Sequence, residues 1–240
     1  MNSLEEKINS YKTPIEVTNL IKKTKIVFLV GITAAGKDTI LRQLIKNPDY
    51  HHIVSHTTRA PRENHGVIEI DGHDYHFIDT QTAETMLDNG GYVEAKMFSG
   101  NIYGTSIAEI KMAHDEGKIA ITDIEVQGVE EYEFLAAKSV TSIFILPPDF
   151  DTWQKRLAKR HEENHMDPTE LKKRLETAGK ELKDSLTKNY FEYVVNDDLD
   201  IAVKIVDEIA HGNFSAKKNE QAKLTAKKLL DDLDKLLKIT

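Results

Sequence analysis

The chain has 240 residues, 40% of them hydrophobic and 30% charged, which is ordinary for a globular protein with a sizeable core. Its formal net charge of −8 argues against a surface that coats nucleic acid, and its lack of cysteine excludes disulfides and thiol catalysis. No apolar run is long enough to span a bilayer, and the polar start MNSLEEKINSYK lacks the basic and apolar regions of a secretory signal. We therefore expect a cytoplasmic protein that has neither a membrane nor a nucleic acid as partner, while its oligomeric state stays open.

The first quarter of the chain contains one strand and one helix that the pattern predicts clearly. Residues 1–23 carry no clear strand and are expected to form an N-terminal extension. The run KIVFLVG, residues 25–31, is apolar, rich in β-forming residues and ended by glycine, so it predicts a buried strand. The segment TILRQLIK then predicts a helix whose apolar face carries Ile40, Leu41, Leu44 and Ile45.

The middle of the chain changes character and then returns to a regular alternation. Within residues 51–105 the short strands HIVSHTT, DYHFID and YVEAKMF are spaced by Gly and Asp, which indicates a small β-rich insertion. Apolar strands follow at KIAITDIE, VTSIFILPP and FEYVVND, with helical stretches between them at SIAEIKMAHDEG, VEEYEFLAAK, DFDTWQKRLAKRHEE and DPTELKKRLETAGKELKDSLTK. Strands that alternate with helices and are apolar on both faces predict an α/β fold with a parallel sheet flanked by helices.

The last segment, residues 212–240, is expected to be an amphipathic helical extension. Its helical stripe consists of Ala222, Ala226, Leu229, Leu230, Leu233, Leu236 and Leu237. A terminal helix packed on the domain is the favoured interpretation of this stripe, and a helix that binds a partner is the alternative.

The stretch GITAAGKDT, residues 31–39, predicts a phosphate-binding loop between the first strand and the first helix. Gly31 and Gly36 let the backbone turn so that successive N–H groups face a phosphate, and the helix N-terminus adds partial positive charge. Lys37 supplies a full charge at the β- and γ-phosphates. The candidate ATP-binding residues of the loop are Gly31, Thr33, Ala34, Ala35, Gly36, Lys37, Asp38 and Thr39.

Asp38 is unusual, because the loop position after the lysine normally carries Ser or Thr, whose hydroxyl holds Mg²⁺. Its carboxylate could bind Mg²⁺ directly, hold it through a water, or repel the triphosphate of ATP. We favour a metal-dependent site, with Thr39 as a second hydroxyl and Asp123, at the carboxyl end of the strand KIAITD, as the acidic partner. The expected Mg²⁺ ligands are therefore Asp38, Thr39 and Asp123.

Several segments, in one order along the chain, resemble guanylate kinases. They are SHTTRAPR (55–62), DGHDYHF (71–77), SGNIYGTS (99–106), DIEVQG (123–128), SIFILPP (142–148) and VVNDDLD (194–200), and the match runs from about residue 25 to 210. The resemblance implies a domain spanning 24–211, with a P-loop core, a GMP-binding subdomain at about 54–105 and a helical lid at about 155–178. It also implies that ATP and GMP, or dGMP, are converted to ADP and GDP or dGDP with Mg²⁺.

The resemblance assigns the acceptor residues one by one. Ser55, Arg59, Arg62, Tyr75 and Tyr103 match the residues that hold the GMP phosphate, and arginine forks with hydroxyls suit a dianion. Glu94 matches the carboxylate that accepts hydrogen bonds from guanine N1–H and the 2-amino group, a donor pair that adenine lacks. Thr105 matches a contact to the guanine carbonyl oxygen. Glu125 stands where the family usually has Asp, near the acceptor-site arginines.

The resemblance also assigns the donor side. RLAKR (156–160) and KKRLETA match the segments that bear the lid arginines, which close over ATP and stabilise charge on the transferring group. The expected catalytic residues are Lys37, Arg59, Arg156, Arg160 and Arg174. Asn196 in VVNDD matches a position near the adenine of ATP.

Five departures from the family pattern put turnover and acceptor preference in question, though not the fold. Three are single residues: Asp38, Glu125, and Ile102 in place of a common Tyr. The other two are lengths: six residues between Arg62 and Glu69 where two are usual, and a lid between Arg160 and Arg174 that is a few residues longer than usual. The segment ENHGVI therefore predicts a loop insertion. HEENH, residues 161–165, satisfies the H-E-x-x-H zinc pattern, but Pro168 follows and no third ligand is evident, so a solvated lid turn is expected instead.

Two other functions stay open. One is a kinase of the same family that acts on a different phosphorylated acceptor, such as ribose bisphosphate. A relative of that kind also has GKD in its loop. Glu94 and Thr105 argue against this alternative, because a sugar phosphate has no base for a guanine-reading pair to bind. The other is an inactive binding module like those of membrane scaffolds. Such modules typically lose the P-loop lysine and the lid arginines, all of which this chain retains.

Overall fold

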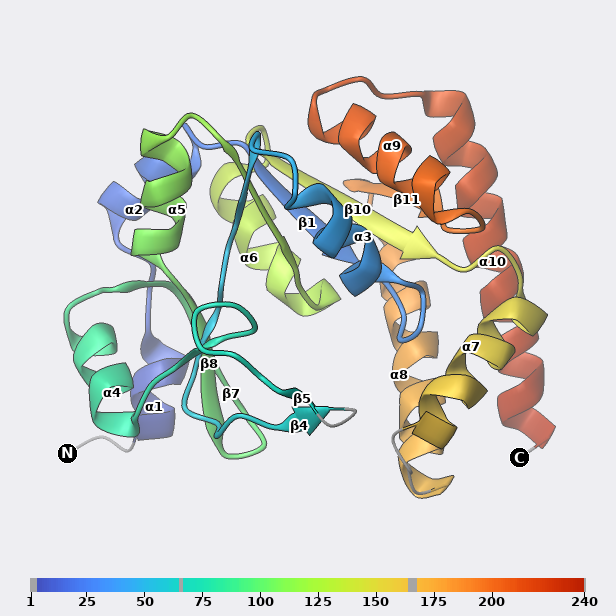
Figure 1. Cartoon of the computed structure of the whole chain (residues 1–240), viewed down its shortest axis with the longest axis horizontal. Helices are drawn as coiled ribbons and strands as arrows, with labels where there is room; N and C mark the ends of the chain where they lie inside the picture. The colour runs from blue at the N-terminus through green and yellow to red at the C-terminus, as the bar shows by residue number, and fades with distance from the viewer. Residues whose placement is uncertain (1–3, 65–66, 164–167, 240) are drawn as a thin grey trace. The chain divides into compact units, whose positions relative to one another are not determined.

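The computed structural model describes residues 4–64, 67–163 and 168–239 (Figure 1). The chain forms two compact units, and each is described by itself below. Unit 1 comprises Met1–Ile26 and Asp49–Ala120, and unit 2 comprises Val27–Pro48 and Ile121–Thr240.

The largest sheet has five strands in an order that requires crossover connections. The order is β11 (Phe191–Val195), β10 (Val140–Leu146), β1 (Ile26–Val30), β9 (Ile119–Asp123) and β2 (Tyr50–His52). β10 and β11 pair in parallel from Ser142 with Phe191 to Leu146 with Val195. Every residue of β1 is buried, as its continuous apolar run predicts for a central strand. The predicted α/β fold, a parallel central sheet flanked by helices, is confirmed.

The helices of unit 2 cover its strands by burying one apolar face each. They are α3 (Lys37–Leu44), α6 (Val126–Ala136), α7 (Phe150–Glu163), α8 (Pro168–Thr187), α9 (Leu199–Ala210) and α10 (Ala216–Ile239). α9 packs against α3, β10 and β11, and α6 packs against β10 and α8. α10 lies along α8 and β11, where it buries Ala222, Ala226, Leu229 and Leu233 (Figure 1). The C-terminal stripe therefore packs inside unit 2.

Unit 1 contains the β-rich region that the sequence predicts. A four-stranded sheet has the order β6 (His76–Phe77), β3 (His56–Thr57), β8 (Asn101–Ser106) and β7 (Tyr92–Phe98). β3 pairs with β6 in parallel and with β8 antiparallel, and β7 with β8 is antiparallel. The loop insertion carries a two-stranded hairpin of β4 (Glu63–Asn64) and β5 (Val67–Ile68), whose connecting residues 65–66 lie outside the described residues.

Four helices complete unit 1, and only α5 (Ile107–Asp115) is predicted by the sequence. The others are α1 (Leu4–Ser10), α2 (Ile15–Ile21) and α4 (Thr80–Asp88). α1 and α2 are too short for a long periodic pattern, and α4 begins at the N-cap Asp79, whose side chain accepts the Thr82 N–H at 2.6 Å. α1 contacts α4 and β7, and α2 contacts α5.

The prediction of a single strand across HIVSHTT is wrong. The structure splits this run into β2, at the edge of the five-stranded sheet, and β3, inside the four-stranded sheet. The two halves have different hydrogen-bond partners, and a local apolar pattern cannot report which partner a strand takes. Ser55 lies between them, and its carbonyl accepts the His76 N–H at 2.9 Å.

Candidate functional site

The loop after β1 has the backbone that a phosphate cradle needs. Gly31 has φ 142° and Gly36 has φ 96°, and Gly36 is the N-cap of α3. A Cβ at Gly31 would lie 2.3 Å from the carbonyl oxygen of Ile145, so glycine is required there. Ala34 also adopts a positive φ, 61°, which is strained for a residue with a side chain. The loop is thus held in a curved conformation with its N–H groups at a helix N-terminus.

Lys37 folds back over this loop. Its Nζ donates a hydrogen bond to the carbonyl of Gly31 at 2.9 Å, so the ammonium spans the loop from the first residue of the helix to the end of the strand. The cation is therefore centred on the cradle and is positioned to meet a phosphate that enters it.

Two side chains from distant segments fix the rest of the loop. Trp153 of α7 is fully buried and donates from Nε1 to the carbonyl of Thr33 at 2.8 Å. Asn196, directly after β11, donates from Nδ2 to the carbonyl of Ala35 at 2.8 Å. Arg156 Nη2 in turn donates to the carbonyl of Asn196 at 3.0 Å. Asn196 and Arg156 thus support the loop, a contact that the sequence analysis did not foresee, and Trp153 was missed altogether.

Two carboxylates flank Lys37. Asp38 and Thr39, in the first turn of α3, are exposed, and Asp123 ends β9. Although the Asp123 side chain reaches solvent, the protein atoms crowded around its carboxyl raise its pKa; Asp38 raises it further, and Lys37 lowers it. Asp38 and Asp123 therefore repel each other electrostatically. Hard oxygen donors with this mutual repulsion fit a Mg²⁺ ion.

A third acid near the loop, Glu181 of α8, was not singled out from the sequence. Burial raises its pKa to about 7, Lys37 lowers it, and Glu125 raises it. Glu125 is exposed at the N-cap of α6 and belongs to unit 2. The charge on Glu181 therefore changes near neutral pH.

The predicted lid arginines lie on two helices of unit 2. Arg160 is exposed on α7, and Arg174 on α8 forms an ion pair with Glu170 at 2.7 Å. Residues 164–167 between the helices lie outside the described residues, and so does His165 of HEENH. Elsewhere in the described chain, no group of three or more His, Asp or Glu side chains could hold a metal ion.

In unit 1, Arg59 is the most enclosed of the predicted phosphate-binding side chains. It is 8% exposed, and its guanidinium lies 5.2 Å from the ring centre of Tyr75 and 5.8 Å from that of Phe77. Nε donates to the hydroxyl of Tyr103 at 3.2 Å. Arg59, Tyr75 and Tyr103 are therefore brought together as predicted, with the guanidinium oriented by aromatic rings.

Glu69, directly after the predicted loop insertion, binds the same guanidinium. Its Oε2 accepts from Arg59 Nη1 at 2.7 Å and its Oε1 accepts from Nη2 at 3.0 Å, a two-pronged ion pair. Oε2 also accepts the backbone N–H of Arg62 at 2.8 Å, while the Arg62 side chain is exposed. Burial raises the pKa of Glu69, but the hydrogen bonds from Arg59 and Arg62 outweigh it and leave the pKa lowered. Sequence spacing flagged Glu69 without giving it this role.

Glu94 and Thr105 lie side by side on β7 and β8. Glu94 is 8% exposed and Thr105 is 3% exposed, and they are register partners. Oε1 of Glu94 accepts the backbone N–H of Thr105 at 3.2 Å. A buried carboxylate thus accepts a backbone N–H from the neighbouring strand.

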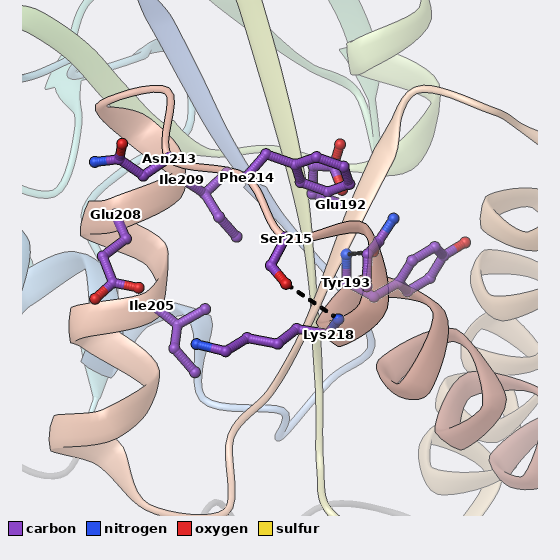
Figure 2. A pocket seen from close by; sticks show the side chains of 10 residues that line it. Glu192, Tyr193, Ile205, Glu208, Ile209, Asn213, Phe214, Ser215 and Lys218 are labelled. Carbon is purple, nitrogen blue, oxygen red and sulfur yellow. Dashed lines mark hydrogen bonds between the residues drawn. The ribbon is translucent and has the colours of Figure 1, made fainter.

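A separate hollow in unit 2 is lined by Glu192 and Tyr193 of β11, by α9 and by residues 213–219 (Figure 2). It contains none of the residues predicted for catalysis or binding. The N–H of Tyr193 donates to Asn219 Oδ1 at 2.7 Å, so α10 satisfies a backbone donor of this edge strand. Burial raises the pKa of Glu192, whose Oε2 is buried without a hydrogen-bond partner in the described part of the chain.

Comparisons with known proteins identify the family of this chain. A family model described as guanylate kinase matches residues 23–212. The chain belongs to the guanylate kinase family. It is 35% identical over 190 residues to the guanylate kinase of Schizosaccharomyces pombe, covering 78% of this chain and 90% of the relative. It is 31% identical to that of Trichormus variabilis over 189 residues, with the same two coverages, 78% and 90%.

Two further matches support less: one covers under half of the relative, and the other has low sequence identity. Guanylate kinase 1 of rice is 37% identical over 179 residues, but the match covers 73% of this chain and only 45% of the rice protein. The crystal structure of guanylate kinase from Anaplasma phagocytophilum superposes with a TM-score of 0.59 at 23% identity, covering 81% of this chain and 89% of that one, which supports the fold.

Membership of this family makes the protein an enzyme, a nucleoside monophosphate kinase. The matches do not favour either alternative, a kinase for another phosphorylated acceptor or an inactive module. Among the described residues, no helix has the length and hydropathy needed to cross a membrane.

Proposed function

We propose that the protein transfers the γ-phosphoryl group of ATP to GMP, and also to dGMP. The observation that carries this proposal is the buried Glu94 carboxylate, held by the Thr105 N–H, in a chain of the guanylate kinase family. Guanine presents N1–H and a 2-amino group side by side, and Glu94 can accept from both. Adenine presents no such pair, so the same carboxylate would reject AMP.

The acceptor phosphate would be held by Ser55, Arg59, Arg62, Tyr75 and Tyr103. Arg59 already gives two of its N–H groups to Glu69 and one to Tyr103. We therefore expect Glu69 to hold the guanidinium in place and to compete with the phosphate for it. Arg62, whose side chain is exposed, would supply a second fork.

The donor would occupy the loop of unit 2. Backbone N–H groups of residues 31–39 and the α3 N-terminus would bind the β-phosphate, and Lys37 would contact the β- and γ-phosphates. Arg156, Arg160 and Arg174 would neutralise charge on the transferring group, which is the main catalytic contribution in phosphoryl transfer. Asn196 would lie near the adenine while it keeps its bond to the loop.

Asp38, Thr39 and Asp123 would hold Mg²⁺ together with the phosphates of ATP. The ion, when bound, supplies positive charge that offsets the phosphates and the two carboxylates. We also expect the enzyme to act on free nucleotides in the cytoplasm, without a nucleic acid or a membrane as partner.

A coupled assay of ADP release, with GMP, dGMP, AMP and ribose bisphosphate as separate acceptors, tests the proposal. We expect turnover with GMP and dGMP and none above background with the other two. Preferred turnover of ribose bisphosphate would replace the proposed acceptor. No turnover with any of the four, in a protein that still binds GMP, would instead support an inactive binding module.

A further inference from the structure

Residues 4–13 lie before the stretch that matches the family, yet they are built into unit 1. α1 contacts β7 and α4, and Ile8 is 5% exposed in an apolar cluster. The other buried members of this cluster are Ala83, Leu87, Tyr92, Ala95 and Ile102. The N-terminal segment thus packs on the strand that carries Glu94.

β7 is irregular directly before Glu94. Tyr92 pairs with Ser106 and Glu94 pairs with Thr105, so Val93 is an extra residue on β7 with no counterpart on β8. Such a bulge bends a strand and redirects the side chain that follows it, and it leaves backbone groups outside the ladder. The direction of the Glu94 side chain therefore depends on how this bulge is held.

Two hydroxyls of the N-terminal segment supply hydrogen bonds at the bulge. Tyr11 donates from its hydroxyl to the carbonyl of Tyr92 at 2.5 Å, and the same hydroxyl accepts the N–H of Tyr92 at 3.2 Å. Thr13 donates from Oγ1 to the carbonyl of Val93 at 2.7 Å. Tyr92 and Val93 are both fully buried, so loss of these hydroxyls would take hydrogen-bond partners away from buried backbone groups.

We propose that Tyr11 and Thr13 are positioning residues for Glu94, and that residues 4–13 thereby set the guanine specificity of the acceptor site. The inference rests on the proposed function, because it takes Glu94 to be the guanine-reading carboxylate. Neither hydroxyl touches the substrate in this account. Each acts through the bulge, by fixing the backbone of the two residues that precede Glu94.

The test compares GMP with inosine monophosphate, which lacks the 2-amino group. A well-placed Glu94 accepts two hydrogen bonds from GMP and one from the inosine nucleotide, so a displaced Glu94 loses more with GMP. For Tyr11→Phe combined with Thr13→Val we expect a roughly tenfold rise in the KM for GMP and a severalfold fall in the preference for GMP. kcat and the KM for ATP should stay at the parent values.

Matched variants separate positioning from general stability. Thr13→Ser keeps the hydroxyl and should behave as the parent. Ser10→Ala removes a hydroxyl from the same segment that bonds only to the carbonyls of Glu6 and Lys7, and it should change neither KM. Hydrogen exchange should show faster exchange of the Tyr92 amide in Tyr11→Phe. If the double variant fails to fold, Tyr11→Phe and Thr13→Val alone carry the comparison.

Three outcomes would overturn the inference, and they differ in what else they remove. Parent-like preference for GMP in Tyr11→Phe and Thr13→Val, with Glu94→Gln impaired, removes the positioning role and leaves the proposed function intact. Parent-like use of GMP in Glu94→Gln removes the proposed guanine reading and the inference with it. Equal losses with GMP, inosine monophosphate and ATP would show that the hydroxyls serve stability alone.

Discussion

At the scale of single residues, the environment of the Glu94 carboxylate matters most for the proposed guanine recognition. It is buried, and its carboxylate accepts the backbone N–H of Thr105. Its neighbour Tyr92 has a pKa raised to about 12 by burial, with Tyr11 and Glu94 adding to the rise. The carboxylate therefore sits in a low-dielectric environment, where a hydrogen bond to a charged acceptor is strong.

Glu94→Gln should impair the use of GMP, because an amide oxygen cannot accept from both guanine donors. We expect kcat/KM for GMP to fall. The fall should correspond to a loss of about 2–4 kcal/mol in transition-state binding, which is the usual effect of breaking a buried charge-assisted hydrogen-bond pair. Circular dichroism should show an unchanged fold. GMP turnover at the parent rate in Glu94→Gln would contradict the assignment.

The Asp38 carboxylate lies in the phosphate-binding loop, where it could hinder the binding of ATP. Two like charges ~4 Å apart interact by about 4 kcal/mol at an effective dielectric of 20, enough to abolish useful binding of ATP. A Mg²⁺ ion between carboxylate and phosphates reverses the sign of that energy. The raised pKa of Asp123, caused by crowding and by Asp38, is consistent with two acids that favour a shared cation.

ATP affinity should therefore depend more steeply on Mg²⁺ in the parent than in Asp38→Ser. Without metal, Asp38→Ser should bind ATP more tightly, because the repulsion is gone. Titration calorimetry across Mg²⁺ concentrations measures both effects without relying on turnover. The same Mg²⁺ dependence in both proteins would mean that Asp38 points away from the metal.

At the scale of elements, α10 shows how burial decides the role of an amphipathic helix. Leu229 and Leu233 are 1% and 0% exposed, whereas Leu224 on the same helix is 55% exposed. The hydrogen bond from the Tyr193 N–H to Asn219 joins the start of this helix to β11. The helix is thus an integral layer of unit 2.

Leu233→Ala should destabilise unit 2 by about 2–5 kcal/mol, the usual effect of a large-to-small change in a packed core. Leu224→Ala is the matched control on the same helix, and it should change stability by less than about 0.5 kcal/mol. Urea unfolding followed by the fluorescence of Trp153, which is buried in unit 2, measures both. Equal effects of the two changes would contradict the packing of α10.

At the scale of the whole molecule, we expect two partly buried groups, Glu181 and His56, to make stability depend on pH in opposite directions. The pKa of Glu181, raised to about 7 by burial, means that the folded protein keeps a proton which the unfolded chain releases above its ordinary pKa of 4.5. Stability is therefore lost as pH rises from about 4.5 to 7. Burial lowers the pKa of His56 to about 4, so unfolded protein binds the extra proton and stability is lost as pH falls from about 6.5 to 4.

Glu181→Gln should remove the first of these dependences. At pH 8 the variant should be more stable than the parent by about 1–3 kcal/mol, because the buried charge is gone, while at pH 4.5 the two should be equal. Thermal unfolding of both proteins between pH 4.5 and 8 measures the difference. Glu176→Gln, on the exposed side of the same helix, is the control, and a constant difference across the pH range would argue against titration of Glu181.

The sequence by itself determined the features that depend on neighbours along the chain. The β1 run, the glycines of residues 31–36 and the periodic helices α3, α7 and α8 are local patterns, and backbone geometry and burial select for them directly. The family resemblance of the short motifs likewise predicted that Glu94 and Thr105 lie together, and they are register partners on β7 and β8. These predictions needed no knowledge of which segments meet in space.

Only the tertiary structure decided which distant groups meet. The bond from Tyr11 to Tyr92 joins residues 81 apart, Trp153 reaches Thr33 across 120 and Asn196 reaches Ala35 across 161. Short helices such as α1 and the split of HIVSHTT between two sheets follow from such contacts as well. The physical reason is the same in each case: the free energy that fixes these residues comes from packing and hydrogen bonds with partners that a local pattern does not contain.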